Sequence, residues 1–127
     1  MINALSKVTV YVDNVNQGKR FWVEKMGFTI REEAAIAPGL VWLEVAASRD
    51  GETTIVLYSR DLMKQQNGNP AHPSIIFSCT DIEAVHQTLI EREVTVTNIE
   101  SFPYGKMFTF YDQDNQSYLI REHSSGN

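Results

Sequence analysis

The sequence predicts an α+β protein built from two βαβββ modules, because one pattern of strand, capped helix and three further strands occurs twice. The first copy begins at 8–15 and the second at 75–82, about half the chain later. Two strand-like segments, 39–45 and 105–111, then follow at matching places. Two copies are too few for a solenoid, so we expect two half-barrels that close on each other and share a cavity.

The length of 127 residues predicts one domain, 1–127, with module 1 at about 5–60, a linker at about 61–73 and module 2 at about 74–123. The hydrophobic fraction of 43% and the charged fraction of 21% are typical of a globular protein with its own core. No apolar stretch is long enough to span a bilayer, and the N-terminus lacks the regions of a signal peptide. We therefore expect a cytoplasmic protein with no membrane partner.

The formal net charge of −5, without any run of Lys or Arg, argues against a nucleic-acid partner. An acidic surface either favours a cationic ligand or only aids solubility. The single cysteine, Cys79, excludes an intrachain disulfide. Because it lies on a predicted strand, we expect a buried, unreactive thiol.

The first predicted strand, 7–12, alternates between a face that packs against the helix and a face that looks into the concave side. The helix-facing residues are Val8, Val10 and Val12. The concave-facing residues are Lys7, Thr9 and Tyr11.

The first helix is predicted over 15–26, with Asn14 as its N-cap and Gly27 directly after its end. Its expected buried members are Phe21, Trp22 and Met26. The stretch 31–37 has no clear pattern. A turn at Pro38-Gly39 then leads into two strands, 41–47 and 53–59.

The linker RDLMKQQNGNPAHP, 60–73, is irregular and has room for one short helical turn. The second helix starts at a predicted capping box, in which Thr80 binds an amide and Glu83 reaches back. Its expected buried face comprises Ile82, Val85, Leu89 and Ile90. The helix is predicted to end near Glu93, and the last strands cover 107–111 and 118–122.

Three motifs add to the repeat. The first is VTVYVDN at 8–14, followed by Phe21-Trp22 and Gly27-Phe28. The second is TDIEA at 80–84. The third leads from FPYG at 102–105 into DQDNQ at 112–116, in which Gln113, Asn115 and Gln116 replace the proline, glycine and asparagine of the family turn F-x-D-P-D-G-N. In this order and spacing the motifs resemble the vicinal oxygen chelate superfamily, which includes glyoxalase I, bleomycin-resistance proteins and extradiol dioxygenases.

The resemblance implies that the two βαβββ modules form a curved, incomplete barrel. It also implies a homodimer, because in many members the cavity lies between the first module of one chain and the second module of its partner.

Metal-dependent members of this superfamily hold a divalent ion with up to four side chains, typically His or Glu. Carried over by the resemblance, the matching positions in this chain are Lys7, Val56, Ser74 and Leu119. A protonated lysine has no lone pair, valine and leucine have none, and serine alone is a poor ligand. We therefore predict no metal ligands at these positions and no cofactor.

Other candidates for chemistry are few. Glu44 interrupts an apolar strand and either faces the cavity as a base or ligand or lies on an exposed face. His72 is the one histidine expected to reach the cavity mouth, while His86 and His123 are expected to face solvent. Lys7 either pairs with Glu44 or a ligand anion, or extends to solvent. The weak catalytic candidates are Glu44, His72 and Tyr11.

Alternation along the strands predicts a concave face with apolar walls and few hydroxyls, which suits a small molecule. Thr54 and Ile76 lie on this face, Trp42, Tyr104 and Phe108 can add aromatic walls, and Phe108 more simply belongs to the core. The predicted ligand-binding residues are Lys7, Thr9, Tyr11, Trp42, Val56, Tyr58, Ser74, Ser78, Tyr104, Leu119 and Arg121.

Two functions remain open. The preferred one is a metal-independent small-molecule-binding protein, similar to the bleomycin-resistance branch, with its ligand in a cavity that lies either within one chain or between the two chains of a dimer. The alternative is a glyoxalase-type lyase or isomerase, or a dioxygenase relative, that uses a displaced metal site.

Overall fold

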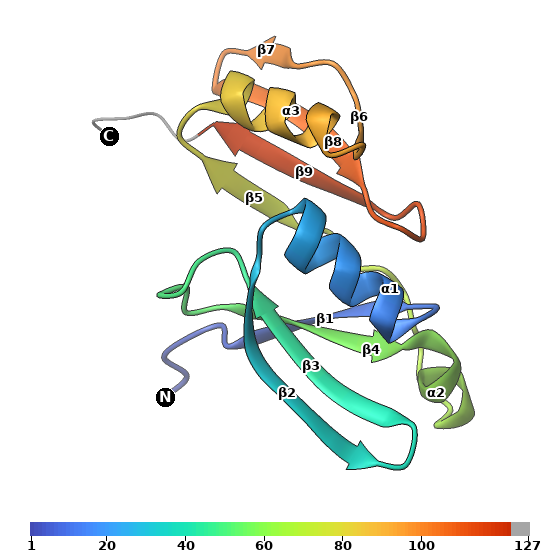
Figure 1. Ribbon diagram of the computed structural model, residues 1–127. Helices are drawn as coiled ribbons and strands as arrows, with labels where there is room; N and C mark the ends of the chain where they lie inside the picture. Colours follow the sequence, from blue (N-terminus) through green and yellow to red (C-terminus); the bar gives the residue numbers. More distant parts are fainter. Residues whose placement is uncertain (123–127) are drawn as a thin grey trace. The chain divides into compact units, whose positions relative to one another are not determined.

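The computed structural model describes residues 1–122 and contains two compact units, one from Met1 to Pro73 and one that begins at Ser74. Each unit has one open β-sheet and a helix that covers one of its faces (Figure 1). Both follow the order strand, helix, strand, strand, strand, with one extra short strand in the second unit. The predicted α+β fold of two βαβββ modules is therefore confirmed.

The first unit has a four-stranded sheet in the order β1-β4-β3-β2, in which β1 runs parallel to β4 and the other pairs are antiparallel. Its elements are β1 (Lys7–Val12), α1 (Val15–Lys19), η1 (Arg20–Lys25), β2 (Thr29–Ala37), β3 (Leu40–Ala46), β4 (Thr54–Ser59) and α2 (Arg60–Gln65). The strand β2 occupies the stretch 31–37 that had no clear sequence pattern. Its residues are mostly exposed, so the hydrophobic alternation that marks a strand is missing there.

The helix of the first unit begins where the sequence predicted. The Asn14 side chain accepts a hydrogen bond of 3.0 Å from the Gln17 amide, and Gly27 closes the helix with a φ of 76°. The second half, η1, is a π-helical turn. Phe21 and Trp22 are buried as predicted, whereas Met26 is only half-buried. Gly18 is buried, which accounts for a glycine inside a helix.

The core of the first unit lies between this helix and one face of the sheet. Val10, Val12, Leu43 and Leu57 are completely buried there, together with Trp22. Trp22 contacts Phe28 with ring centroids 5.0 Å apart. Lys19 of α1 reaches Glu33 of β2 at 2.6 Å, so odd-numbered positions of β2 near this point face the helix. The alternate positions of these strands therefore face away from the helix.

The second unit has a sheet in the order β5-β9-β8-β6, with β7 also paired to β8. Its elements are β5 (Ile76–Cys79), α3 (Ile82–Glu91), β6 (Thr95–Val96), β7 (Glu100–Phe102), β8 (Gly105–Tyr111) and β9 (Ser117–Glu122). Phe110, Tyr118 and Ile120 are buried on the face that α3 covers. The rings of Phe110 and Tyr118 stack with centroids 5.0 Å apart.

The predicted capping box of α3 is wrong by one residue. Asp81, not Thr80, is the N-cap, and its carboxylate accepts a hydrogen bond of 3.2 Å from the Ala84 amide. Glu83 instead forms an ion pair with Lys106 at 2.6 Å. Ile82 and Leu89 are buried and Val85 is half-buried as part of the same face, but Ile90 is 46% exposed. The chain leaves the helix at Glu93, which takes the left-handed conformation usually reserved for glycine (φ 62°).

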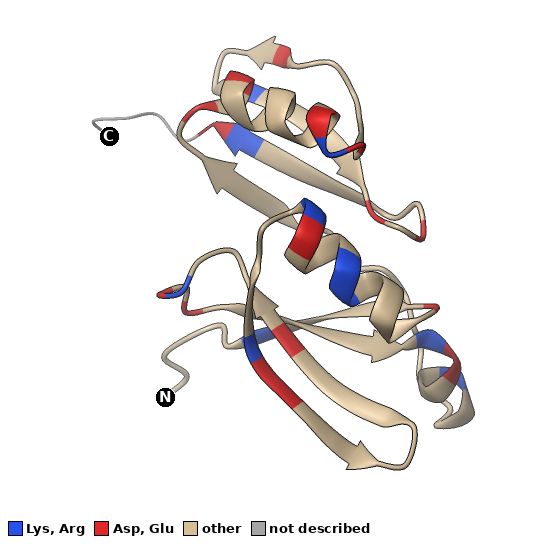
Figure 2. Ribbon diagram, viewed as in Figure 1, with Lys and Arg blue, Asp and Glu red and all other residues tan. Residues whose placement is uncertain are grey.

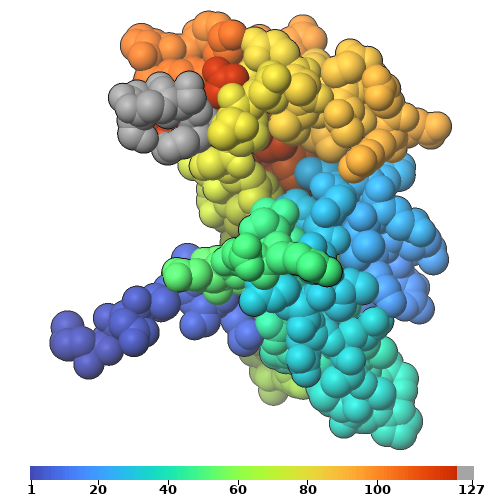
Figure 3. All heavy atoms as spheres, turned by 60° about the vertical axis from the view of Figure 1, so that its left-hand side comes forward, coloured from blue at the N-terminus to red at the C-terminus, as the bar shows by residue number. Residues whose placement is uncertain are grey.

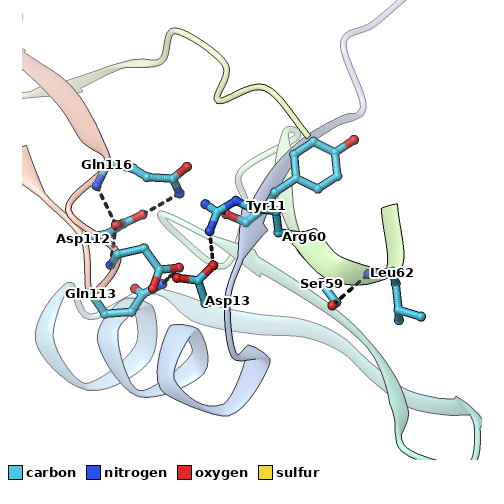
Figure 4. Close-up of polar contacts among 9 residues, drawn as sticks. Tyr11, Asp13, Ser59, Arg60, Leu62, Asp112, Gln113 and Gln116 are labelled. Atoms are coloured by element: carbon cyan, nitrogen blue, oxygen red, sulfur yellow. Dashed lines mark hydrogen bonds and ion pairs between the residues drawn. The ribbon is translucent and has the colours of Figure 1, made fainter. Parts of the chain in front are cut away.

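The turn between β8 and β9 forms although three residues depart from the family pattern. The Asp112 carboxylate is buried and accepts hydrogen bonds from the amides of Asp114 and Gln116 and from the Tyr118 hydroxyl. Figure 4 shows the bonds between Asp112 and Gln116. Asn115 stands where the pattern has glycine and adopts a φ of 63°. Asparagine tolerates this left-handed conformation better than other non-glycine residues, so the turn keeps its shape.

The N-terminal residues extend from the first unit as an exposed arm, drawn in blue in Figure 3. Met1 and Ile2 are fully exposed. The arm is anchored where the carbonyl of Leu5 accepts from the Thr53 hydroxyl and that of Ser6 accepts from the Thr54 amide.

None of the helices within residues 1–122 has the length and apolar character needed to cross a membrane.

The corrected cap can be tested with two substitutions. Asp81→Ala should lower the free energy of unfolding by about 1 kcal/mol, because it removes the acceptor for the Ala84 amide. Thr80→Ala should have a smaller effect, since Thr80 is exposed and does not cap the helix. Urea unfolding monitored by circular dichroism measures both, and a larger loss for Thr80→Ala would restore the original capping box.

Candidate functional site

The open face of the first sheet carries the side chains that the sequence placed on the concave side. The registers Lys7–Thr54, Thr9–Val56 and Tyr11–Tyr58 put these pairs on one face of the parallel strands. Glu44 lies opposite Val56 on the neighbouring strand, so it joins the same face, and Trp42 follows two residues away. Eight of the sequence-predicted residues, including two of the weak catalytic candidates, therefore share one surface within this unit.

Glu44 is the centre of a polar cluster on this face. Its side chain is only 7% exposed, and both carboxylate oxygens are engaged. Lys7 Nζ donates to Oε1 at 2.6 Å, the hydroxyl of Thr54 donates to the same oxygen at 3.1 Å, and Trp42 Nε1 donates to Oε2 at 2.7 Å. Of the alternatives open for Lys7, the pairing with Glu44 is the one that the structure has.

Burial by itself would raise the pKa of Glu44, but the hydrogen bonds from Lys7, Trp42 and Thr54 and the positive charge of Lys7 outweigh it. The pKa of Glu44 therefore falls below its ordinary value of 4.5. The carboxylate is held in its charged form, and its lone pairs are directed at donors of the protein itself. Figure 2 shows the acidic positions on the neighbouring strands β2 and β3.

Two tyrosines complete this face near the end of the strands. The rings of Tyr11 and Tyr58 meet edge to face with centroids 6.4 Å apart. Arg60, at the start of α2, forms an ion pair with Asp13 and donates a hydrogen bond of 3.1 Å to the carbonyl of Tyr11 (Figure 4). His72 is half-buried in the segment between α2 and β5 and does not join the Glu44 cluster.

The second unit contains a pocket on the open face of its own sheet, with a volume of about 300 Å³. The register pairs Ile76 with Leu119, Ser78 with Arg121 and Thr109 with Leu119, so these side chains share the face away from α3. The residues that line the pocket are Thr97, Asn98, Glu100, Phe102, Tyr104, Met107, Phe108, Thr109 and Leu119. Predicted residues Tyr104 and Leu119 are among them, while Ser78 lies on the same face and Ser74 is exposed just before β5.

An aromatic pair forms one wall of the pocket. The rings of Phe102 and Tyr104 are stacked almost parallel, with an angle of 8° and centroids 5.3 Å apart. Both remain accessible, with Phe102 38% and Tyr104 60% exposed. Arg121 donates a hydrogen bond of 2.9 Å to the Tyr104 carbonyl, which fixes the turn between β7 and β8. Stacked rings that stay exposed offer a flat apolar surface to a planar ligand.

His86 supports the pocket from behind, which corrects the expectation that it faces solvent. Its Nε2 lies 2.8 Å from the carbonyl of Thr97, and its ring meets Phe108 edge to face at 4.8 Å. Thr97 is in turn joined to Thr109, whose amide donates to the Thr97 hydroxyl at 2.9 Å. Phe108 is only 2% exposed, so it belongs mainly to the core, as the sequence favoured. His123 lies outside the described residues.

Comparison with known proteins decides the family. The family model described as the Glyoxalase/Bleomycin resistance protein/Dioxygenase superfamily matches residues 4–120. The chain belongs to this superfamily. It is 32% identical over 123 residues to the uncharacterized protein YetH of Bacillus subtilis (strain 168), covering 96% of this chain and 100% of that protein.

Solved structures share the fold. TnmS3, described as an antibiotic binding protein from Streptomyces sp. CB03234, has a TM-score of 0.81 at 24% identity, and the match covers 97% of this chain and 98% of that one. A superfamily member from Sphaerobacter thermophilus DSM 20745 has a TM-score of 0.82 at 22% identity, with coverage of 96% and 98%.

The metal site of metal-dependent superfamily members does not fit the residues of this chain. In the first unit, Lys7 offers an ammonium that already pairs with Glu44, and Val56 has no donor atom. In the second, Leu119 has none, and Ser74 offers only a hydroxyl. Glu44 is the nearest substitute ligand in its unit, but its carboxylate is already bound by three side chains.

A second acidic group also fails as a metal site. Oxygens of Asp81, Glu83 and Glu122 lie within 4.8 Å of one another. Each is already engaged, because Asp81 and Glu122 accept from the first amides of α3 and Glu83 pairs with Lys106. Burial and these carboxylates raise the pKa of the nearby Cys79 thiol, which keeps that half-buried cysteine in its unreactive form.

The sequence missed several pocket residues for one reason. The segment 97–101 carries no strand or helix pattern in the sequence, so nothing there points to Thr97, Asn98 or Glu100, and the FPYG motif marks Phe102 only as part of the family pattern. Alternation along β8 was the available signal for Met107 and Thr109, since both lie on the same face as Leu119.

The Glu44 cluster predicts a pH dependence of stability. Because the pKa of Glu44 is lower in the folded protein than in the unfolded chain, the stabilisation is complete above about pH 4.5 and is lost as the pH falls through the folded pKa. Glu44→Gln should cost about 1–3 kcal/mol at neutral pH, and the difference from the wild type should shrink in acid.

Urea unfolding at several pH values between neutral and about pH 3 measures this difference. Glu83→Gln is the matched control, because it removes an exposed ion pair and should change stability much less. An equal stability of Glu44→Gln and wild type at neutral pH would contradict the account of the cluster.

Proposed function

We propose that this protein binds a small aromatic molecule in the pocket of its second unit and does so without a metal ion. The observation that carries the proposal is the accessible stack of Phe102 and Tyr104 beside the apolar side chains of Met107 and Leu119. A concave, mostly apolar site with a few polar groups is the usual form of a small-molecule pocket. Thr97, Asn98 and Thr109 supply the polar groups.

The engaged state of Glu44 supports binding over catalysis. A general base or metal ligand needs a lone pair directed at the substrate or ion. In this chain Lys7, Trp42 and Thr54 use the carboxylate oxygens instead. The description of TnmS3 as an antibiotic binding protein supports a ligand-binding role within the same fold.

Aromatic binding can be tested with 2-naphthol, a neutral two-ring probe. Phe102→Ala should weaken its affinity roughly two- to tenfold, because the stacking contribution of one ring is lost. Ile36→Ala is the control, since Ile36 is an exposed apolar residue of β2 in the other unit. Isothermal titration with both variants measures the change. Absence of 2-naphthol binding to the wild type, or equal affinities for wild type and Phe102→Ala, would overturn the proposal.

The enzymatic alternative is a lyase, isomerase or dioxygenase relative that uses a displaced site, for which Glu44, His72 and Tyr11 are the candidates. It predicts that nickel, zinc, manganese or ferrous iron raises the melting temperature and supports turnover of hemithioacetals or catechols. We expect neither effect, because both oxygens of Glu44 already accept hydrogen bonds from the protein. A thermal-shift and activity screen with these metals decides between the two functions.

A homodimer with a cavity shared between chains remains part of the proposal. Light scattering coupled to size-exclusion chromatography tests it by giving the molar mass in solution. A mass equal to one chain would confine the binding site to a single copy.

A further inference from the structure

We propose that the ligand of this pocket carries a positive charge, held by the carboxylate of Glu100 next to the Phe102–Tyr104 stack. The inference rests on the proposed function, because it names the class of molecule that the same pocket takes: an aromatic amine in its cationic form. It adds a specificity-determining residue that neither the sequence pattern nor the superfamily comparison singles out.

The position of Glu100 follows from the register of β7. Glu100 lies opposite Met107, and Phe102 lies opposite Gly105, so Glu100 and Phe102 share the face of the sheet that bears the pocket. Both residues line it. Ser101, between them, lies opposite Lys106 and points to the other face, where Lys106 pairs with Glu83. The lysine of β8 is therefore turned away from Glu100.

Glu100 carries the formal charge of the pocket. The other side chains that line it are apolar, aromatic, hydroxyl or amide groups. Within the described residues, the Glu100 side chain has no hydrogen-bond or ion-pair partner. Figure 2 shows the acidic position on β7. A carboxylate beside exposed aromatic rings is a combination that attracts organic cations, because the ring faces and the carboxylate both carry negative potential.

Arg121 is the positive charge nearest in register that could attract an anion instead. It lies on β9 opposite Met107, which has Glu100 on its other side, so Arg121 and Glu100 share one face of the sheet. Its guanidinium already donates to the Tyr104 carbonyl, and Arg121 does not line the pocket. It therefore serves to hold the aromatic turn, and the pocket retains a net negative charge. A ligand whose carboxylate pairs with Arg121 is the alternative, and an anionic probe tests it.

Three isosteric probes separate charge from ring binding: 2-naphthylmethylamine as the cation, 2-naphthalenemethanol as the neutral form and 2-naphthoate as the anion. At neutral pH and low salt the cation should bind about two- to fivefold more tightly than the alcohol, and the advantage should decrease with added salt. Glu100→Gln should remove this advantage and leave the affinity for the alcohol unchanged. Glu91→Gln, which removes the same negative charge from an exposed position of α3, should leave the preference intact.

The outcomes distinguish this inference from the proposed function. Equal binding of all three probes, or an undiminished preference for the cation in Glu100→Gln, would overturn the assignment of Glu100 while binding of aromatic molecules stands. Tighter binding of 2-naphthoate that is lost in Arg121→Gln would overturn it in favour of an anionic ligand. If the wild type binds none of the probes, both the inference and the proposed function fail.

Discussion

A carboxylate buried in a β-sheet must be matched by hydrogen-bond donors, and Glu44 obtains three of them from Lys7, Trp42 and Thr54. This requirement organises the open face of the first sheet. It holds the lysine side chain across the strands, orients the Trp42 indole and engages both oxygens of Glu44. In a superfamily in which some members bring cations to this face, an ammonium of the chain itself neutralises the carboxylate. The polar groups at the centre of this face therefore interact with one another.

The two units repeat one topology but give their open faces different properties. The face of the first sheet is centred on the Lys7–Glu44 ion pair, in which Glu44 is buried and Lys7 is exposed, whereas that of the second has a pocket with stacked rings and apolar side chains. The difference arises at a few positions on the strands. Leu119 and Thr109 leave the second face without a strong charge at its centre. The outer edge of this sheet is divided into β6 and β7, where the first unit has the single strand β2, and Phe102 of β7 adds to the aromatic wall. The repeated topology thus carries a polar cluster in one unit and a largely apolar pocket in the other.

Much of the fold follows from local rules that one sequence displays. The valine alternation of β1, the Asn14 cap and the Gly27 terminator are short-range signals, and all three are confirmed. The sequence pattern does not predict β2, because β2 is an edge strand with mostly exposed side chains. Its conformation is set by pairing with β3 and not by burial. The candidate site is harder to predict from the sequence than the fold, because the Glu44 cluster joins three strands and the pocket depends on the placement of 97–102. Such contacts are set by register, which composition and periodicity do not give.

The central claim is that the side chains of this protein, and not a metal ion, satisfy Glu44. Metal analysis of protein purified without chelators, by inductively coupled plasma mass spectrometry, tests this most directly. The account predicts divalent metal far below one ion per chain, with no difference between the wild type and Glu44→Gln. One tightly held ion per chain that disappears in Glu44→Gln would contradict it, because the carboxylate would then be a ligand rather than the partner of Lys7.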